Sequence, residues 1–365
     1  MRTQDLRAFY AGRRVLVTGS TGFKGSWLCR MLRHLGADVY GYALVGPTQP
    51  SMWEIAGLAA AVDQTTADIR DMDALSAVFE RVRPQAVLHL AAQPLVIDSY
   101  ERPRYTYETN VMGTVNVLEC ARLAPSVTSL LNVTTDKVYE NRERAGYGYQ
   151  EDDKLDGFDP YSNSKSCSEL VTHSYVKSFF APDARGEAAG RCQVSTARAG
   201  NVIGGGDFSA NRIVPDCVRA AQTGEPMVIR NPNSVRPYQH VLEPLVAYLA
   251  IVAGQQTGAV PAGWYNIGPD DADSITTGEL VQLFAKAWGA GFTYEARNVD
   301  GPHEANFLKL DNGRAKRELG WHPVWGVAEA IDRTVAWTKA WLDCGNESAT
   351  ACMDKQIDEY LGAWE

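Results

Sequence analysis

The sequence contains no uninterrupted apolar run that approaches the roughly 18 residues needed for a membrane-spanning helix. Its first residues, Met1 to Leu6, also lack the apolar core of a signal peptide. The seven cysteines show neither a Cys-x-x-Cys spacing nor an evident pairing, which predicts buried thiols in a reducing compartment. Together these absences predict a cytoplasmic protein with no membrane partner.

A surplus of positive charge is also missing. Lys and Arg number 35 against 44 Asp and Glu, and the net charge of -9 argues against a nucleic-acid partner, since phosphate binding needs a clustered basic face. The sequence has no internal repeat and no low-complexity tract. Its 365 residues, 45% hydrophobic and 22% charged, are typical of a globular chain with one large domain or two closely associated ones.

The first unit that the sequence does contain is a short strand, a glycine-rich turn and a helix. A β-branched run, Arg13 to Thr18, leads into Gly19-x-x-Gly22-x-x-Gly25, and apolar residues then recur at helical spacing to Leu35. In this order the glycines allow a tight turn, the approach of a pyrophosphate and close helix–strand packing. The helix N-terminus offers free N–H groups to the phosphates. The unit therefore predicts a dinucleotide site.

Strands and helices continue to alternate up to residue 200. We expect strands near residues 38–45, 65–68, 86–92, 127–133 and 193–198, with helices at 72–82, 105–123 and 161–180. This order predicts an α/β fold with a Rossmann-type, doubly wound parallel sheet. Ligands of such sheets bind at the carboxyl ends of the strands. There we expect the glycine turn, Asp68, the Ala91-Ala92 pair and Thr135-Asp136-Lys137 to form a single site.

The pattern changes after residue 200, where Asn201 precedes a second glycine-rich turn and prolines separate short elements. We predict a smaller mixed α/β C-terminal lobe for the substrate, formed by residues 201–236 and 257–345, with helices at 275–288 and 326–342. Residues 1–200 would form the cofactor-binding domain, to which 237–256 return. Residues 346–365 are predicted to form a C-terminal tail.

An acidic residue is missing where many such folds have one. It usually follows the glycines by about 20 positions, at the end of the second strand, and binds the ribose of NAD. This chain has Val45-Gly46-Pro47-Thr48 there, and Asp38 begins the strand rather than ending it. The choice between NAD and NADP stays open at this position.

Groups able to move protons gather between Leu130 and Lys165. An apolar strand ends at Thr135-Asp136-Lys137, and Tyr161 and Lys165 share one face of a helix that Pro160 begins. A phenol, with a pKa of about 10, becomes a usable base beside an ammonium and a cationic nicotinamide. With Thr135 orienting the same hydroxyl, the set is suited to oxidising an alcohol. A surface helix with an ordinary aromatic and a solvated amine would show the same spacing.

These motifs resemble the extended short-chain dehydrogenase/reductase superfamily, and within it most closely the CDP-glucose 4,6-dehydratases. The similar stretches reach to about Trp321 and include residues 22–28, 89–96, 134–141, 159–165, 199–207 and 236–244. Asp156 and the end of the second strand depart from the family pattern. The resemblance implies NAD as cofactor, bound by Gly19, Thr21, Gly22, Phe23, Lys24, Gly25, Asp68, Ile69, Ala91, Ala92, Gln93, Thr109 and Asn110.

The resemblance also implies a reaction on a nucleotide sugar, with CDP-glucose as the expected substrate. Tyr161, with Thr135 and Lys165, would deprotonate the C4 hydroxyl during hydride transfer. Asp136 would then protonate the departing C6 hydroxyl while Lys137 removes the C5 proton, after which the hydride returns to C6. These duties need the uncharged forms of both groups, which burial favours. An Asp136–Lys137 ion pair that caps the strand is the structural alternative.

Substrate contacts are expected from the second lobe: Asn201 with its glycine turn, Arg212, Arg236 and His303. No metal site is predicted, because His303 has no second ligand at helical spacing. Relatives commonly dimerise through the helices at 105–123 and 161–180, which implies a homodimer. A C4 epimerase would not need Asp136 and Lys137. An epimerase, a dehydratase for a UDP-, dTDP- or GDP-sugar and a non-catalytic dinucleotide-binding regulator are the alternatives.

Overall fold

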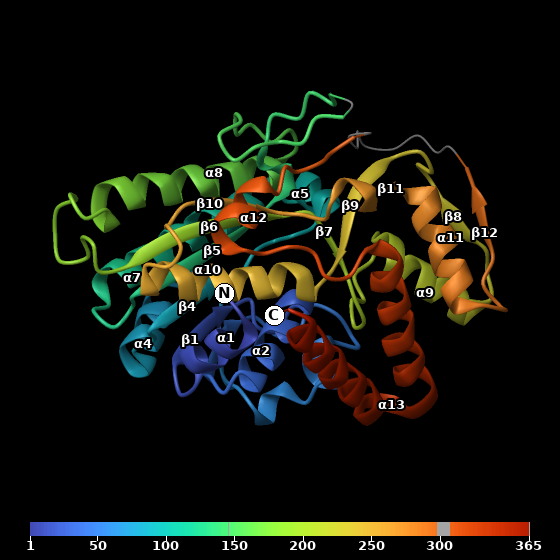
Figure 1. Ribbon diagram of the computed structural model, residues 1–365, viewed down its shortest axis with the longest axis horizontal. Helices are drawn as coiled ribbons and strands as arrows, with labels where there is room; N and C mark the ends of the chain where they lie inside the picture. Colours follow the sequence, from blue (N-terminus) through green and yellow to red (C-terminus); the bar gives the residue numbers. More distant parts are fainter. Residues whose placement is uncertain (145, 298–306, 365) are drawn as a thin grey trace.

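The computed structural model describes residues 1–144, 146–297 and 307–364, and its centre is a seven-stranded parallel sheet (Figure 1). The strand order is β10-β6-β5-β4-β1-β2-β3, so the chain reverses its direction of progress between β1 and β4. The predicted Rossmann-type sheet is confirmed. Its strands are β1 (Arg14–Thr18), β2 (Asp38–Ala43), β3 (Asp63–Thr66), β4 (Ala86–His89), β5 (Ser129–Thr135), β6 (Gln193–Ala199) and β10 (Trp264–Ile267).

Helices cover both faces of this sheet. One layer contains α1 (Thr3–Tyr10), α2 (Phe23–His34) and α10 (Leu242–Thr257), and the other contains α4 (Met72–Val82), α7 (Gly113–Leu123) and α8 (Pro160–Tyr175). Successive strand residues face opposite layers, so Leu131 of β5 packs with the first layer and Leu130 with the second. Burial on both faces explains why these strands appear in the sequence as continuous apolar runs.

The connecting segments are short helices. Three of them extend helices that the sequence predicts as single elements: α6 (Pro103–Tyr107) and η2 (Glu108–Met112) precede α7, and η4 (Val176–Phe180) follows α8. The remaining ones are α3 (Met52–Ile55), η1 (Leu58–Ala60), α5 (Val96–Glu101) and η3 (Asp136–Val138). In the described part of the chain, no helix combines the length and apolar character needed to cross a membrane.

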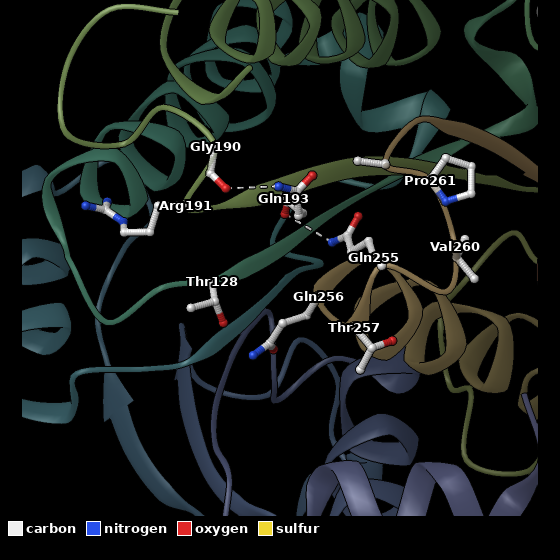
Figure 2. Close-up of a pocket in the computed structure, with 11 residues that line it drawn as sticks. Thr128, Gly190, Arg191, Gln193, Gln255, Gln256, Thr257, Val260 and Pro261 are labelled. Carbon is white, nitrogen blue, oxygen red and sulfur yellow. Dashed lines mark hydrogen bonds between the residues drawn. The ribbon is translucent and has the colours of Figure 1, made fainter. Parts of the chain in front are cut away.

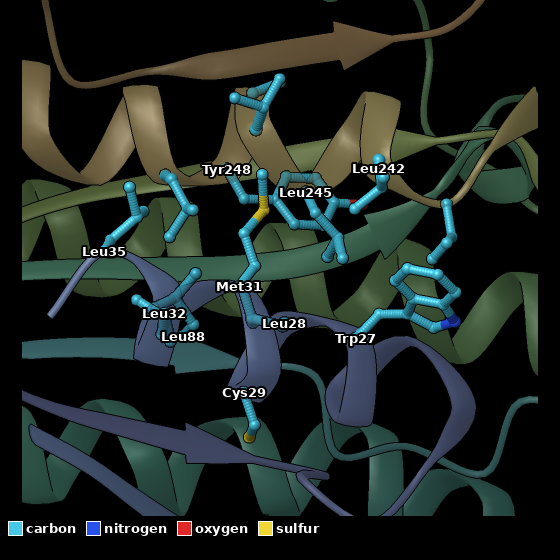
Figure 3. Packing of buried hydrophobic residues seen from close by; sticks show 14 of the residues in the cluster. Trp27, Leu28, Cys29, Met31, Leu32, Leu35, Leu88, Leu242, Leu245 and Tyr248 are labelled. Carbon is cyan, nitrogen blue, oxygen red and sulfur yellow. The ribbon is translucent and has the colours of Figure 1, made fainter. Parts of the chain in front are cut away.

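The contact between α2 and α10 brings the second half of the chain back to the first. Figure 3 shows Trp27 and Met31 of α2 on the side that faces Leu245 of α10. All three side chains are fully buried. Full burial of an apolar side chain contributes about 1.5–3 kcal/mol. This interface therefore fixes the predicted return of residues 237–256 to the cofactor-binding domain.

The last strand of the sheet belongs to a different domain from the one that the sequence predicts for it. Residues 257–345 were expected to belong to the second lobe, but β10 pairs in parallel with β6 at the sheet edge. The following α12 (Gly313–Leu319) packs on β10 and α10. A strand of four residues is too short for its sheet to be identified from sequence pattern alone.

The second lobe lies beside the carboxyl ends of the central strands (Figure 1). It contains a three-stranded sheet in the order β11-β9-β7 and a two-stranded sheet of β12 and β8. Its elements are β7 (Asn201–Ile203), α9 (Ile213–Thr223), β8 (Met227–Ile229), β9 (Val235–His240), η5 (Asp271–Asp273), β11 (Ser274–Thr276), α11 (Thr277–Trp288) and β12 (Tyr294–Ala296).

The C-terminal helix α13 (Val327–Ala363) joins the two parts of the molecule. Its first half packs on α11, and it kinks at Gly345, where φ is 77°. Beyond the kink, Met353, Ile357 and Tyr360 are fully buried in the same core as α2 and α10. The predicted tail, 346–365, is therefore part of the packed body over its described residues, and Arg30 of α2 holds it through a 2.6 Å ion pair with Asp354.

His34 of α2 gives this attachment a pH dependence. Its pKa is raised, chiefly by a hydrogen bond to Asp354, with Asp358 adding to the effect and burial opposing it. A raised folded-state pKa stabilises the fold fully below about pH 6.5, the unfolded value, and the stabilisation is lost as pH rises through the folded pKa. His34→Gln should therefore lower Tm by about 1–2 °C at pH 6 and have almost no effect at pH 9.

Thermal melts across this pH range test the expectation. His322→Gln, a change at an exposed histidine before α13, is the matched control and should give equal shifts at both pH values. An equal loss of Tm at pH 6 and pH 9 in His34→Gln would contradict the role assigned to its charge.

Candidate active site

The glycine turn between β1 and α2 has the geometry of a phosphate site. Gly19 has a φ of +74°, and a Cβ there would lie 2.7 Å from the Ala91 backbone nitrogen. A Cβ at Gly25 would lie 2.1 Å from the Gly19 carbonyl oxygen. Gly22, the N-cap of α2, has no such overlap, its nearest neighbour being at 3.4 Å. Gly19 and Gly25 thus close the turn, and Gly22 leaves the helix N-terminus open to an anion.

One of the predicted cofactor-binding residues, Thr109, has a buried polar atom without a partner. The hydroxyl of Thr109, on η2, is buried and has no hydrogen-bond partner in the described structure. Such groups are normally satisfied by protein, water or ligand. Together with the open turn at Gly22, this orphaned hydroxyl fits a bound dinucleotide.

Other predicted cofactor residues shape the site by contacts within the protein. Thr21 donates to the Leu44 carbonyl at 2.9 Å, tying the turn to the end of β2. Asn110 accepts from the Gln93 backbone at 2.8 Å and donates to Ser164 on α8 at 2.9 Å. The rest lie around the same strand ends: Phe23 against Gly204, Asp68 in a 2.7 Å ion pair with Arg70, Ile69 against Gly113, and Ala91 and Ala92 after β4.

The end of β5 brings together the predicted acid, base and hydroxyl. Thr135 donates through Oγ1 to Asp136 Oδ1 at 2.9 Å, and Lys137 Nζ donates to the same oxygen at 3.0 Å. Asp136 is fully buried, and its second oxygen, Oδ2, has no partner in the described structure. A Cβ on Gly200 would lie 3.2 Å from that oxygen. The ion pair considered as an alternative is thus present, but it leaves one buried carboxylate oxygen available to a ligand.

The start of α8 brings Tyr161 to the same place. Asp159 caps the helix by accepting from the Ser162 backbone at 2.9 Å, and Pro160 occupies its first turn as predicted. Lys165 is buried, and its Nζ donates to the Val133 carbonyl of β5 at 3.1 Å. Burial lowers the pKa of Lys165 to about 8, although the nearby Glu169 carboxylate raises it. Helix and strand are therefore joined by the lysine of the Tyr-x-x-x-Lys pair.

The electrostatics of Tyr161 differ in one respect from the prediction. Burial raises its pKa, and the cation that opposes this most is Lys137, followed by a hydrogen-bonding interaction with the Thr135 hydroxyl. Lys165, which was expected to supply the lowering charge, is directed to a backbone carbonyl instead. The sequence could not reveal the effect of Lys137, because the end of β5 and the start of α8 come together only in the folded protein.

Lys24, a cation at the glycine turn, also faces this centre. Lys24 Nζ lies 3.4 Å from the phenol of Tyr248, a buried residue of α10 that the sequence did not single out. Burial lowers the pKa of Lys24 to about 7, with further lowering by the charges of Arg212 and Lys165. Lys24 is therefore placed among the catalytic groups as well as beside the predicted cofactor turn.

A buried ion pair between Glu169 and Arg198 packs next to the predicted catalytic residues. Glu169, one turn beyond Lys165 on α8, accepts from Arg198 of β6 at 2.9 Å and from Thr196 at 2.7 Å. It also accepts a short hydrogen bond from Thr134 of β5. Neither member of the pair is exposed to solvent. The i, i+4 spacing from Lys165 was the only signal in the sequence that could have identified Glu169.

Glu169→Gln should destabilise the protein by about 3 kcal/mol, because Arg198 would then be buried without a counter-charge. Urea unfolding followed by circular dichroism measures the loss. Glu119→Gln, which breaks a partly exposed pair with Arg122, is the control and should cost less than about 1 kcal/mol. A similar small cost for both variants would show that the buried pair contributes little.

The second lobe supplies two of its four predicted substrate residues to this centre. Asn201 Oδ1 accepts from Lys137 Nζ at 3.3 Å. Arg212, paired with Asp207 at 2.8 Å, acts through its charge on both Tyr161 and Lys24. Arg236 lies on β9, where it donates to the Val235 carbonyl at 2.9 Å, and its contact with substrate stays a prediction. His303 lies outside the described residues.

The glycine turn after β7 is closely packed, and its contact with substrate stays a prediction. A Cβ on Gly205 would lie 2.1 Å from the Trp337 ring, and one on Gly206 would lie 2.2 Å from Met52 Sδ. The Gly205 carbonyl accepts from the Trp27 indole at 3.0 Å. These glycines therefore let the second lobe fit closely against α2 and α13.

A cavity of about 610 Å3 lies at the opposite, amino-terminal edge of the sheet (Figure 2). Two of the side chains that line it bond to backbone carbonyls: Gln255 donates to the Gln193 carbonyl at 3.1 Å, and Arg191 donates to the Arg122 carbonyl at 3.0 Å. The proton-transfer groups lie at the other edge, so the candidate active site is the cluster around Thr135 and Tyr161. Within the described residues, no three His, Cys, Asp or Glu side chains form a metal site.

Comparison with known proteins agrees with the Rossmann-type fold. The profile of the family described as GDP-mannose 4,6 dehydratase matches residues 16–334. The CDP-glucose 4,6-dehydratase of Salmonella typhimurium is 44% identical over 97% of this chain and 98% of its own. The UDP-glucose 4-epimerase of Thermus thermophilus, solved with NAD, has a TM-score of 0.76 at 26% identity and covers 89% of this chain and 99% of its own. The UDP-glucose 4-epimerase of Thermotoga maritima shares the fold, with a TM-score of 0.77 at 22% identity over 90% and 99% of the two chains.

Proposed function

Because the chain belongs to the GDP-mannose 4,6-dehydratase family, we propose that it is an NAD-dependent nucleotide-sugar 4,6-dehydratase that converts CDP-glucose to CDP-4-keto-6-deoxyglucose. The observation that carries the proposal is the buried carboxylate of Asp136, with one free oxygen, beside Thr135 and Lys137. An oxidation site needs only Thr135, Tyr161 and Lys165. The 44% identity with a CDP-glucose 4,6-dehydratase supports CDP-glucose over other nucleotide sugars.

The oxidation half of the reaction uses the groups at the starts of α8 and η3. When bound, NAD supplies the hydride acceptor for C4 and returns the hydride to C6. Tyr161 accepts the C4 hydroxyl proton, Thr135 orients that hydroxyl, and Lys165 keeps α8 in register with β5 through its bond to the Val133 carbonyl. The N-terminus of α2, which Gly22 caps, and the free hydroxyl of Thr109 would hold the cofactor.

The elimination half uses the Asp136–Lys137 pair. A single proton moved across the 3.0 Å contact from Lys137 Nζ to Asp136 converts the ion pair into a carboxylic acid and a neutral amine. The 4-keto group acidifies the C5 proton, so the neutral Lys137 can remove it. Asp136 then protonates the departing C6 hydroxyl, which leaves as water. The two groups of one pair thus supply the acid and the base.

Incubation of the purified protein and NAD with a panel of CDP-, UDP-, dTDP- and GDP-glucose tests the proposal. A 4-keto-6-deoxy product is expected with CDP-glucose, with a kcat/KM at least tenfold above the others, about 1.4 kcal/mol of discrimination. A C4-epimerised sugar with retained C6 hydroxyl would assign an epimerase instead. Unchanged sugars throughout the panel would favour the non-catalytic regulator.

Two finer properties accompany this function. We infer a homodimer, because the neighbouring elements η2, α7 and α8 expose apolar side chains at Met112, Leu123 and Leu170. Light scattering should give a dimer mass that Leu170→Glu reduces to the monomer, while Leu342→Glu on α13 has no effect. A monomeric mass for the unaltered protein would contradict the inference.

The seven free thiols support a reducing, cytoplasmic location.

A further inference from the structure

His89 is a buried polar residue that lies outside the catalytic cluster. It ends β4 beside Thr18, the last residue of β1, and the two are register partners in the central sheet. The hydroxyl of Thr18 lies 2.7 Å from His89 Nδ1, and His89 Nε2 lies 3.1 Å from the hydroxyl of Thr114 on α7. All three side chains are buried. One imidazole therefore bonds through its two nitrogens to two different elements.

The surrounding bonds fix the direction of both hydrogen bonds to this ring. Thr114 donates its own proton to the Asn110 carbonyl at 2.7 Å, so it accepts from His89 Nε2–H. Burial, with a further contribution from the charge of Lys165, lowers the pKa of His89 to about 3, and the ring is neutral. A neutral imidazole carries a single N–H, so Nδ1 is an acceptor and Thr18 donates to it.

The two ends of this chain of bonds lie at the cofactor turn and on the catalytic helix. Thr18 Oγ1 also accepts from the Ala91 backbone N–H at 3.3 Å, and a Cβ on Gly19 would lie 2.7 Å from the same nitrogen. At the other end, the hydroxyl of Thr114 lies 2.9 Å from that of Ser168 on α8. His89 thus connects the strand end that leads into the glycine turn with the helix that carries the proposed base.

A branch through Asn110 reaches the proposed base more directly. The Asn110 side chain donates to Ser164 Oγ at 2.9 Å, and Ser164 Oγ donates to the Tyr161 carbonyl at 2.7 Å. The residue before Asn110 is Thr109, whose orphaned hydroxyl fits the cofactor. The bonds that meet at Thr114 therefore hold both the start of α8 and a group expected to bind NAD.

We propose that His89 is a positioning residue that sets the distance between the dinucleotide turn and Tyr161. Its Nδ1 holds the turn through Thr18, and its Nε2 holds α8 through Thr114. Hydride transfer needs near contact, and a displacement of about 1 Å can cost roughly 100-fold in rate. Hydrogen bonds are directional, so they define such a distance more narrowly than apolar contacts, which are not.

Two substitutions each keep one half of this link. In His89→Asn the amide reaches the position of Nδ1 and can accept from Thr18, whereas in His89→Gln it reaches that of Nε2 and can donate to Thr114. His89→Asn should bind reduced nicotinamide cofactor, titrated by its fluorescence, within about twofold of the unaltered Kd and lose about tenfold or more in kcat. His89→Gln should keep most of its kcat at saturating cofactor and bind it about fivefold more weakly, as expected for the loss of one buried hydrogen bond.

His240→Asn is the matched control, because His240 is also a fully buried, neutral histidine. Its Nδ1 accepts from the Leu242 backbone at 3.3 Å, and its Nε2 has no partner among the residues that the structure describes. This variant should lose stability without a change in Kd or kcat. Parallel losses of affinity and kcat in both His89 variants, or no change in either variant, would overturn the positioning role.

Thr18→Val tests the same link with a smaller disturbance if the His89 variants do not fold. It removes the hydroxyl at nearly constant volume and should weaken cofactor binding by about fivefold, and Thr18→Ser should restore the affinity. An unchanged Kd in Thr18→Val would overturn the proposal. The kcat values rest on the proposed dehydration, whereas the Kd values do not. Failure of the proposed function would therefore leave the Kd shifts in place while no 4-keto product forms.

Discussion

Replacing Tyr161 with phenylalanine should lower kcat with CDP-glucose by about a thousandfold, as expected when a positioned proton-transfer group is removed. The phenol is the group that receives the C4 proton, and the ring alone preserves the packing of α8. The phenol of Tyr248 on α10, which also lies near this centre, is engaged with Lys24 and should not substitute for it. Product formation measured as a 4-keto sugar gives kcat, and fluorescence titration with NAD shows whether the cofactor still binds.

Tyr175→Phe provides the matched control for this change. Tyr175 lies at the end of the same helix, where its hydroxyl contacts Glu119 at 3.4 Å, remote from the end of β5. Its loss should leave kcat within about twofold of the unaltered value, since single hydrogen bonds at the surface contribute little. Unchanged turnover in Tyr161→Phe would show that the site does not oxidise C4 as proposed.

Replacing Lys137 with methionine should lower dehydration by about a thousandfold while leaving part of the first step intact. Lys137 is the proposed base for the C5 proton, whereas Thr135, Tyr161 and Lys165 remain in place. Mixing the variant with CDP-glucose and NAD should therefore make reduced nicotinamide accumulate, visible by its absorbance. The unaltered enzyme should consume that form too quickly for it to accumulate.

The same experiment separates two roles of Lys137. Its charge also lowers the pKa of Tyr161 against the effect of burial, so a purely electrostatic role would slow the oxidation itself. In that case no reduced nicotinamide would accumulate, and the assignment of Lys137 as the base would be wrong. Lys355→Met removes an exposed ammonium from α13 and should leave both steps unchanged.

The glycine turn and the Tyr161–Lys165 pair were predictable because their chemistry depends on local spacing. A turn between a strand and a helix forces Gly19 into a positive φ, and a four-residue spacing puts two side chains on one helix face. The Rossmann-type sheet was equally predictable, because strands buried on both faces need long apolar runs separated by helices. These local patterns were sufficient to predict the fold and the family, which the structure and the comparisons confirm.

The predictions that failed depended on contacts between distant parts of the chain. β10 joins the main sheet through four residues, and residues 346–363 of α13 pack on α2 instead of forming a tail. The close fit of Gly205 against Trp337, more than a hundred residues later, was also not predictable from the sequence. No signal within either segment shows which distant element it packs against.

The sequence by itself determined which chemical groups this protein brings to its site and on which elements they lie. It identified a glycine turn, a Thr-Asp-Lys strand end and a Tyr-x-x-x-Lys helix, all at the carboxyl ends of parallel strands. Only the tertiary structure decided how the groups are connected: Lys137 rather than Lys165 acts most on Tyr161, and Thr135 bonds to Asp136. Hydrogen bonds and charges act over a few ångströms, and those distances between residues far apart in the chain are fixed only when the sheet and its helices pack.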